Sequence, residues 1–352
     1  MTTAVLLSGG VDSSVALHLL RDQGVEDLRA FYLKVWLEEE VMSFGADCPW
    51  EEDVQYARTT CERLGVPLEI IPLQTEYLER IVEHVLTELR AGRTPSPDVF
   101  CNRRIKFGAF LDRVGESVQT VASGHYARTT TDDAGCAHLL RAPDPVKDQT
   151  YFLSQLTQQQ LRRIRFPIGD LTKSEVRQLA ADWELPARDR KDSQGICFLG
   201  KIDYRQFIEY HLGQRPGPIV DIDTESQLGE HRGYWFYTIG QRYGLGLSGG
   251  PWFVVAKQME DNVLYVTHGE HRQKRSRSSF AAQQPNWIAA APASGSFQLK
   301  LRHGPDLADC HMNIGDDGGL QIDLDQPDSG VAPGQHAVIY ADEECLGGAI
   351  IC

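Results

Sequence analysis

The stretch Ser8-Gly9-Gly10-Val11-Asp12-Ser13-Ser14 separates an apolar run from a periodic one. The apolar residues 4–7 before it predict a buried strand, and the apolar spacing over residues 15–20 after it predicts a helix. The two glycines permit a tight turn in which main-chain N–H groups and the first N–H groups of the helix point into one concavity. Such a concavity binds anions, because hydroxyl donors and the positive end of the helix dipole also favour negative charge. The stretch therefore predicts a phosphate-binding loop at the first strand–helix junction.

The loop lacks the lysine of another common phosphate-binding pattern. No Lys-Ser or Lys-Thr follows at the spacing G-x-x-x-x-G-K-S/T, so an enzyme that transfers the γ-phosphoryl group of ATP is disfavoured. Instead, the loop resembles the pyrophosphate loop of the N-type ATP pyrophosphatases. The resemblance implies that ATP is split between its α and β phosphates and that a carbonyl oxygen is adenylated, but it does not identify the substrate.

Composition bounds the class of protein. A chain of 352 residues is long enough for two or three domains with their own cores. Hydrophobic residues make up 41% of the chain without a run long enough to span a membrane, and no signal peptide is recognisable. We therefore expect a soluble cytoplasmic protein. We also expect a monomer, although no feature of the sequence determines the oligomeric state. The formal net charge of −14 argues against indiscriminate nucleic-acid binding, although local clusters of arginine leave room for a basic face.

The order of apolar patterns predicts three domains. Strand-like runs at residues 28–36, 68–73 and 118–122 alternate with helical patterns at 51–64, 77–89 and 105–114. This alternation predicts an α/β domain with a doubly wound parallel sheet over residues 1–204. Short strands between glycines predict a small central, mostly-β domain over residues 205–274. Alternating runs predict a C-terminal antiparallel β-barrel over residues 275–352.

Two of the eight cysteines stand beside basic residues. Cys101 lies in the proline-containing segment 92–106, which we interpret as a loop with Asp98 or Asn102 capping the next helix, and Cys197 lies in a second loop. Neighbouring cations favour the thiolate, so the two side chains are candidates for a nucleophile, a persulfide carrier or a transient disulfide. Local sequence alone leaves open that they are unrelated buried thiols. Since no two cysteines form a C-x-x-C pair, a zinc ribbon is disfavoured.

Five motifs together resemble the bacterial tRNA-specific 2-thiouridylases. They are the segments 95–107, 123–128, 147–153, 191–198 and 238–246. The resemblance extends from the first strand to residues 345–348 and implies the same three-domain fold. It implies 2-thiolation of uridine at the wobble position of tRNA anticodons, by adenylation at C2 followed by sulfur transfer from a cysteine persulfide. The implied partners are tRNA and a persulfide-carrying donor protein, and the implied cofactors are ATP and Mg²⁺, for which no protein ligand is assigned.

The resemblance also implies roles for individual residues. The ATP site would comprise Leu6, Leu7, Ser8, Gly9, Gly10, Val11, Asp12, Ser13, Leu33 and Gly124. Ser96, Pro97 and Asp98 would contact the target base, and tRNA would touch His125, Lys147, Asp148, Gln149, Arg302, His303 and Gln335. Cys101 would be the nucleophile and Cys197 the persulfide carrier, linked by a transient disulfide, and Asp98 is our candidate general acid or base. The family commonly has Asn in place of Ser96 and Met in place of Leu33. Of these two roles, base contact through Ser96 has the weaker support from the resemblance.

Two other functions use the same features. Another adenylating ligase, of the argininosuccinate, GMP or NAD synthetase kind, would share the loop but would not need the cysteine pair. A non-catalytic RNA-binding protein with an inherited nucleotide fold would not release pyrophosphate when tRNA is present.

Overall fold

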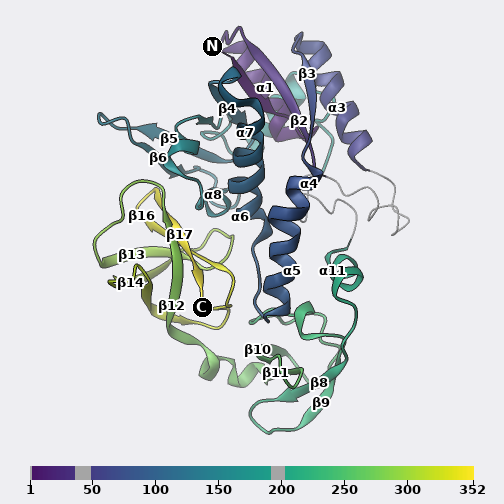
Figure 1. Ribbon diagram of the computed structural model, residues 1–352, viewed down its shortest axis with the longest axis vertical. Coiled ribbons are helices and arrows are strands. Elements are labelled where there is room, and N and C mark those ends of the chain that lie inside the picture. The colour runs from purple at the N-terminus through teal and green to yellow at the C-terminus, as the bar shows by residue number, and fades with distance from the viewer. Residues whose placement is uncertain (1, 36–48, 192–202) are drawn as a thin grey trace.

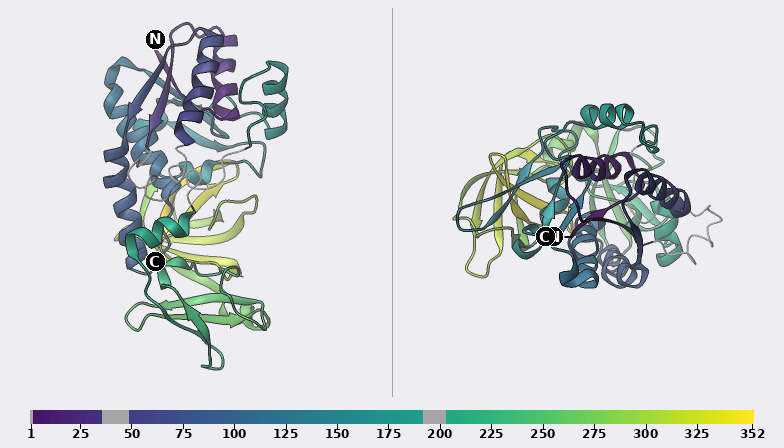
Figure 2. Two further views of the ribbon diagram at one scale, coloured as in Figure 1. Left: turned by 90° about the vertical axis from the view of Figure 1, so that its right-hand side faces the viewer. Right: turned by 90° about the horizontal axis from the view of Figure 1, so that it is seen from above.

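The computed structural model describes residues 2–35, 49–191 and 203–352. The molecule is elongated, with a parallel sheet and its helices at one end and a small sheet at the other (Figure 1). The C-terminal barrel lies between them, as the turned view in Figure 2 also shows. The order of the three parts in space therefore differs from their order in the sequence, where the small sheet stands between the other two.

The N-terminal part is built on a parallel sheet with the strand order β3-β2-β1-β4-β7. Its strands are β1 (Thr3–Leu6), β2 (Leu28–Lys34), β3 (Leu68–Pro72), β4 (Thr120–Ser123) and β7 (Ile164–Arg165). Its shorter helical elements are α1 (Val11–Asp22), α3 (Pro49–Leu64), α8 (Thr150–Leu153), α9 (Gln158–Leu161) and α10 (Lys173–Asp182). The carboxyl ends of β1, β2 and β4 meet at one edge, which is where sheets of this kind bind ligands.

Helices cover both faces of this sheet because its central strand is apolar on both. Val5 and Leu7 of the first strand and its exit pack in one cluster with α1 and α3. Ala4 and Leu6 belong to a second, larger cluster with the helices of residues 74–114. Successive side chains of a strand point to opposite faces, so a continuous apolar run indicates burial on both sides.

Two long helical segments form the cover of the second face, and each contains π-helix. The first comprises α4 (Gln74–Tyr77), η1 (Leu78–Val82) and α5 (Glu83–Arg90). The second comprises α6 (Pro97–Cys101), η2 (Asn102–Ala109), α7 (Phe110–Val114) and the 3₁₀ turn η3 (Gly115–Ser117). π-Helical turns are rare and recur at functional sites, and the second one begins directly after Cys101.

The interpretation of residues 92–106 as a loop is wrong from Pro97 onward. Helix α6 begins at Pro97, whose fixed φ suits the first helical position. The capping prediction is wrong as well, because Asp98 lies in the first turn and Asn102 lies inside the continuous helix. There the Asn102 Nδ2 donates to the Phe152 carbonyl oxygen at 3.1 Å. The prolines and charged residues of this segment are typical of a loop, although several of its apolar residues are buried in the fold.

The C-terminal part is an antiparallel barrel, which closes because β12 pairs with both β15 and β17. Its strands are β12 (Arg277–Trp287), β13 (Gly295–Lys300), β14 (Ala308–Ile314), β15 (Leu320–Asp328), β16 (His336–Ala341) and β17 (Glu344–Ile351). A hairpin of the N-terminal part, β5 (Ala127–Thr131) and β6 (Ala137–Arg141), adds to the edge of β17. The sequence did not predict this pairing, since it joins segments about 200 positions apart, Leu140 standing opposite Glu344.

The small sheet has the strand order β10-β11-β8-β9. It follows helix α11 (Tyr204–Leu212) and consists of β8 (Gly217–Asp221), β9 (Gln227–His231), β10 (Trp252–Gln258) and β11 (Val263–His268), with 3₁₀ turns η4 (Tyr234–Phe236) and η5 (Gly269–Arg275). The predicted fold class is confirmed: an α/β part with a doubly wound sheet, a small mostly-β part and an antiparallel barrel.

Helix α10 begins with a capping box, whose sequence signature is a threonine, Thr172, followed three positions later by a glutamate, Glu175. The Thr172 hydroxyl accepts from the Glu175 N–H, and the Glu175 carboxylate accepts from the Thr172 N–H at 2.7 Å. This start places Lys173 at the first helical position. Within the described ranges, no helix combines the length and the apolar character that crossing a membrane requires.

Candidate functional site

The predicted phosphate-binding loop joins the end of β1 to the start of α1. Gly9 has a φ of +77°, and a Cβ atom there would lie 2.2 Å from the Asp53 carbonyl oxygen, so only glycine fits. The Ser13 hydroxyl accepts from the Ser8 N–H at 3.2 Å and donates to the Gly10 carbonyl oxygen at 3.1 Å. These bonds hold the turn against the N-terminus of α1, where main-chain N–H groups and the helix dipole favour an anion.

The ends of β2 and β4 border this loop. At Gly124 a Cβ atom would lie 2.7 Å from the Ser13 main-chain nitrogen, so glycine lets β4 approach the start of α1. Leu33, next to last in β2, is partly buried against the larger core cluster. Leu6 and Leu7 are buried in clusters on opposite faces of the sheet, so their main chain rather than their side chains is placed to meet a nucleotide. The structure thus brings all predicted ATP-binding residues to one edge of the sheet.

Lys173 borders the loop, a position that its sequence context did not reveal. Its Nζ lies 2.6 Å from Asp12 Oδ1, which also accepts from the Tyr126 hydroxyl at 2.8 Å. Because 161 positions separate Lys173 from Asp12, no local spacing signals this contact. The capping-box pattern of residues 172–175 marks this helix terminus in the sequence but does not indicate its contact with the loop.

Arg190 is the second cation at the loop. It donates through Nη1 to the Gly9 carbonyl oxygen at 2.9 Å and through Nη2 to Asp53 Oδ1 at 2.7 Å. Its guanidinium also lies 4.5 Å from the centre of the Tyr56 ring. Burial raises the pKa of Asp53, and the bond and charge of Arg190 oppose that rise. Arg190 therefore fixes the turn and adds positive charge where phosphates would lie.

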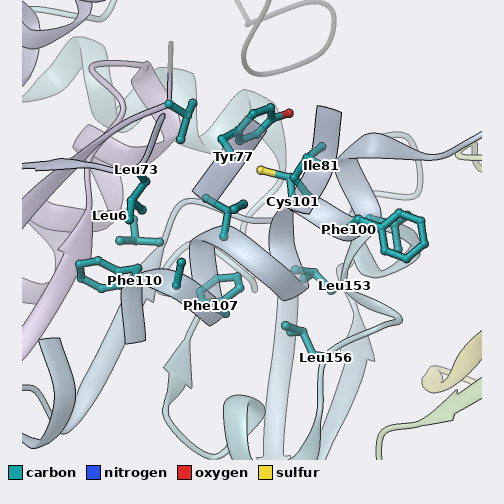
Figure 3. Packing of buried hydrophobic residues seen from close by; sticks show 14 of the residues in the cluster. Leu6, Leu73, Tyr77, Ile81, Phe100, Cys101, Phe107, Phe110, Leu153 and Leu156 are labelled. Atoms are coloured by element: carbon teal, nitrogen blue, oxygen red, sulfur yellow. The ribbon is translucent and has the colours of Figure 1, made fainter. Parts of the chain in front are cut away.

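Cys101 ends helix α6 and lies in the larger core cluster. Its side chain is 3% exposed and packs in the cluster that contains Leu6, Tyr77 and Ile81. Figure 3 shows its sulfur pointing toward Tyr77, while the Phe100 ring points away from the sulfur. The expected loop position of this cysteine is wrong. A thiol buried this deeply meets a macromolecular substrate only after the segments around it open.

Asp98 lies one turn before Cys101, in the first turn of α6. Burial raises the pKa of Tyr204, the first residue of α11, and the charge of Asp98 raises it further. The Asp98 carboxylate is therefore within electrostatic reach of the start of α11.

Cys197 lies outside the described residues, but the residues on either side of its segment have clear positions. Arg190, before it, bonds the phosphate-binding loop. After it, Phe207 and Ile208 of α11 belong to the same buried cluster as Cys101. One end of the intervening chain therefore lies at the phosphate-binding loop, and the other end leads into the buried cluster that contains Cys101.

The segments 147–149 and 302–303, both predicted to touch tRNA, lie together at the barrel. Asp148 is fully buried, and its Oδ2 lies 2.7 Å from the Nζ of Lys300, which is fully buried as well. Burial raises the pKa of Asp148, but Lys300 and Thr150 outweigh it, so the pKa lies below its ordinary value. The exposed His303 donates through Nε2 to the Asp148 carbonyl oxygen at 3.2 Å and stacks on Phe152. The Asp148 carboxylate itself has no surface that RNA can reach in this conformation.

The segment predicted to contact the base lies against the barrel too. The Gln335 Nε2 donates to the Thr94 carbonyl oxygen at 3.4 Å, and the Thr94 N–H donates to the Pro333 carbonyl oxygen at 2.8 Å. A hydrogen bond from Ser96 lowers the pKa of Tyr151, although burial raises it overall to about 12. The structure therefore brings Ser96 and Gln335, which are distant in sequence, to one junction.

His125 lies apart from these residues, after β4 and beside Gly124. Its Nδ1 lies 2.9 Å from the Ser123 hydroxyl, and its ring lies about 6 Å from the rings of Phe107 and Phe166. Burial and the charge of Lys106 hold the pKa of His125 well below its ordinary value. The imidazole is therefore neutral near pH 7.

Three family models match successive parts of the chain. The tRNA methyl transferase HUP domain matches residues 1–201, the tRNA methyl transferase PRC-barrel domain residues 205–268, and the Aminomethyltransferase beta-barrel domain residues 277–351. The chain is also 44% identical to the tRNA-specific 2-thiouridylase MnmA of Parabacteroides distasonis over 360 residues, covering 100% of this chain and 99% of that protein. The chain belongs to the tRNA-specific 2-thiouridylase family. The family and the enzyme class predicted from the sequence are confirmed.

Another thiouridylase and one solved structure are also similar to this chain. The tRNA-specific 2-thiouridylase MnmA of Porphyromonas gingivalis is 41% identical over 362 residues, covering 100% of this chain and 99% of that protein. The U34-tRNA thiolase NcsA from Methanococcus maripaludis, solved with its 4Fe-4S cluster, is 19% identical at a TM-score of 0.35, covering 60% of this thiouridylase and 67% of that chain.

Proposed function

We propose that this chain catalyses the ATP-dependent 2-thiolation of uridine at wobble position 34 of tRNA anticodons. One observation carries the proposal. The end of β1 and the Cys101 helix pack in one buried cluster, and the chain that contains Cys197 leaves the phosphate-binding loop at Arg190 and returns at α11 beside Asp98. A nucleotide site beside Cys101, with the described ends of the chain that contains Cys197 at the same place, is compatible with C2 activation followed by sulfur insertion.

The first step uses the loop. The C2 carbonyl of uracil is a poor electrophile, and its oxygen is a poor leaving group. Attack of that oxygen on the α-phosphorus of ATP forms an O-adenylate and breaks the bond to pyrophosphate, which residues 8–13 would hold. Lys173 and Arg190 supply positive charge beside the departing group, while Leu33 and Gly124 border the nucleotide.

Magnesium would assist this step by neutralising phosphate charge. The two described carboxylates bonded at the loop, Asp12 and Asp53, are already paired with Lys173 and Arg190. We therefore propose that Mg²⁺ is held mainly by phosphate oxygens and water, which suits its reluctance to lose its hydration shell.

The second step uses the two cysteines. Sulfur from a donor protein is carried as a persulfide on Cys197. Attack of the Cys101 thiolate on the inner sulfur of this persulfide forms the Cys101–Cys197 disulfide and releases hydrosulfide, which displaces AMP from C2. Alternatively, the outer sulfur attacks C2 first and Cys101 then breaks the S–S bond, giving the same products. In either order a dithiol reductant must reopen the disulfide, whose formation requires Cα atoms within about 7 Å.

Base and RNA contacts complete the proposal. Ser96, Pro97 and Asp98 would contact the extruded uracil, with Asp98 as general acid or base. Extrusion costs least from a single-stranded loop. His125, Lys147, Gln149, Arg302, His303 and Gln335 would contact tRNA, and Asp148 would act by holding Lys300 and the backbone that His303 bonds. We assign adenylation to residues 1–204 and further tRNA contact to residues 275–352, in a cytoplasmic monomer.

The test combines the protein with ATP, Mg²⁺, unmodified tRNA and a persulfide donor, and it measures 2-thiouridine by mass spectrometry and pyrophosphate release in parallel. The wild type should form both products. Cys197→Ser should form pyrophosphate without thiolated tRNA, whereas the matched control Cys352→Ser, at an exposed cysteine, should form both.

Each alternative function has its own outcome in the same assay. Pyrophosphate release that needs no tRNA, yields no 2-thiouridine and is fully retained in Cys101→Ala would favour another adenylating ligase. Binding of tRNA without release of pyrophosphate would favour an RNA-binding protein. If the Cys197→Ser variant still forms 2-thiouridine, Cys197 is not the persulfide carrier.

A further inference from the structure

A cavity of about 440 Å³ lies between the second helical segment and the barrel. Its lining includes Phe100, Arg103, Arg104, Gln155, Gln284 and Asn286. Figure 3 shows the Phe100 ring pointing away from the Cys101 sulfur. Cys101 is not among the residues that line the cavity, and none of the roles proposed above uses it.

The cavity carries two positive charges that the described residues leave uncompensated. Arg103 donates through Nη1 to Gln155 Oε1 at 2.9 Å, and Arg104 donates through Nη1 to the Arg80 carbonyl oxygen at 2.9 Å. Both acceptors are neutral, and no carboxylate in the described ranges forms an ion pair with either guanidinium. Burial lowers the pKa of both arginines, and the charge of Arg103 lowers the pKa of Arg104 further. Two half-buried like charges side by side repel each other and are partly desolvated, and a bound anion would relieve both costs.

The surroundings orient these charges. Gln155 donates through Nε2 to the Gly348 carbonyl oxygen at 2.8 Å, which leaves its Oε1 directed at Arg103. The Arg104 guanidinium lies 4.3 Å from the centre of the Phe100 ring. Each arginine keeps N–H donors for a ligand, and the planar fork of a guanidinium matches the oxygens of a phosphate.

The barrel side of the cavity is irregular in the way that binding sites often are. Strand β12 bulges between Gln283 and Asn286 in its pairing with β17. The exposed Gln284 has a φ of +53°, a left-handed conformation that is strained for a side chain other than glycine. The bulge brings an uncharged amide to the mouth of a cationic cavity, which adds hydrogen-bonding capacity without cancelling the charge.

We propose that this cavity binds a backbone phosphate of the substrate RNA, at a nucleotide near the extruded uridine, through Arg103 and Arg104. The inference rests on the proposed function and deepens it. An α-helix with its side chains is about 10–12 Å across, so an RNA strand whose extruded base enters on the Asp98 side can place a nearby phosphate on the other side. Recognition of a phosphate positions the strand without reading its sequence.

The first test measures affinity for an anticodon stem-loop RNA by fluorescence anisotropy at several salt concentrations. The variant Arg103→Gln/Arg104→Gln should bind at least about 10-fold more weakly, and the slope of log Kd against log salt should fall by about 0.7 for each lost phosphate contact in a single strand. The control is Arg63→Gln, at an exposed arginine of the same part that also makes one hydrogen bond to a carbonyl oxygen, that of Glu184. It should leave affinity and slope unchanged, and circular dichroism checks that each variant is folded.

The second test replaces single phosphates of the stem-loop by neutral methylphosphonates. One replacement should weaken binding to the wild type and have no further effect on the double variant, because the same contact is already lost. Unchanged affinity and slope in the folded double variant would overturn the proposal, as would a methylphosphonate penalty that persists in it, or a wild type that does not bind the RNA.

The experiments distinguish failure of the proposed phosphate site from failure of the proposed function. Binding that depends on the arginines, in a wild type that never thiolates tRNA, would support the cavity and overturn the function. Normal RNA binding by the double variant, with slow sulfur transfer from a donor protein only, would indicate an acidic protein surface as the ligand and overturn the RNA assignment.

Discussion

Arg190 donates a hydrogen bond from Nη1 to the carbonyl oxygen of Gly9 at 2.9 Å, although 181 positions separate the two residues. The same guanidinium bonds Asp53 at 2.7 Å, so one side chain joins the phosphate-binding loop to helix α3 and to the chain that precedes Cys197. A contact with the nucleotide loop is thereby linked to the segment proposed to carry sulfur.

Replacement of Arg190 by glutamine should weaken the use of ATP. The change removes one hydrogen bond from a charged donor to the loop, at Gly9, and one to Asp53 of α3, each worth about 1.5–3 kcal/mol. We expect KM for ATP to rise roughly 10-fold or more, measured as tRNA-dependent pyrophosphate release. The control Arg188→Gln removes an exposed arginine that pairs with Asp189. Equal KM values for the two variants would contradict a role for Arg190 in shaping the loop.

Two glycines with the same φ make it possible to distinguish the effect of backbone strain from the effect of a steric clash. Gly9 and Gly24 both have a φ of +77°, but a Cβ atom at Gly24 would meet nothing within 4 Å, whereas at Gly9 it would lie 2.2 Å from the Asp53 carbonyl oxygen. Gly24→Ala should lose about 1–2 kcal/mol of unfolding free energy and keep ATP binding. Gly9→Ala should lose more stability and should also lose ATP binding, as titration calorimetry would measure. Retention of ATP affinity in Gly9→Ala would contradict the fit of the loop.

The buried pair Asp148–Lys300 should be far more important for stability than an exposed pair. Asp148→Asn leaves the Lys300 ammonium buried without its counter-charge, which should lower the free energy of unfolding by about 3–5 kcal/mol in urea denaturation. The additional change Lys300→Met should recover part of this loss. As a control, Glu343→Gln at the exposed pair Arg128–Glu343 should cost at most about 1 kcal/mol. Similar losses in the two single variants would show that the buried pair contributes no more than a surface pair.

The hairpin β5–β6 should make stability depend on pH near neutrality. Glu344 Oε1 lies 2.6 Å from His138 Nδ1, and this carboxylate, with Asp132, raises the pKa of His138. Because the folded pKa lies above the unfolded value of about 6.5, the contribution is fully present below pH ~6.5 and is lost as pH rises through the folded pKa. Unfolding free energies from pH 5.5 to 9 should therefore show a fall that His138→Gln removes and that His311→Gln, at an exposed histidine on β14, retains. A fall that survives in His138→Gln would assign the pH dependence to other groups.

The sequence was sufficient to predict those features that depend on residues close together in the chain. The turn from β1 to α1, the capping box of α10 and the alternation of strands with helices follow from glycine positions, a short polar signature and apolar spacing. The helix that carries Asp98 and Cys101 was misassigned as a loop because its stability comes from burial of Val99 and Phe100, which local propensity does not report.

The sequence by itself therefore determined the phosphate-binding loop, the fold class and the family. The tertiary structure decided that Arg190 and Lys173 border the loop, that Asp148 is an interior partner of Lys300, that β5 and β6 extend the barrel, and that Arg103 and Arg104 line a cavity. The physical reason is distance along the chain. Local motifs depend on backbone conformation within a few residues, whereas ion pairs, sheet edges and cavities arise only when packing brings separated segments together.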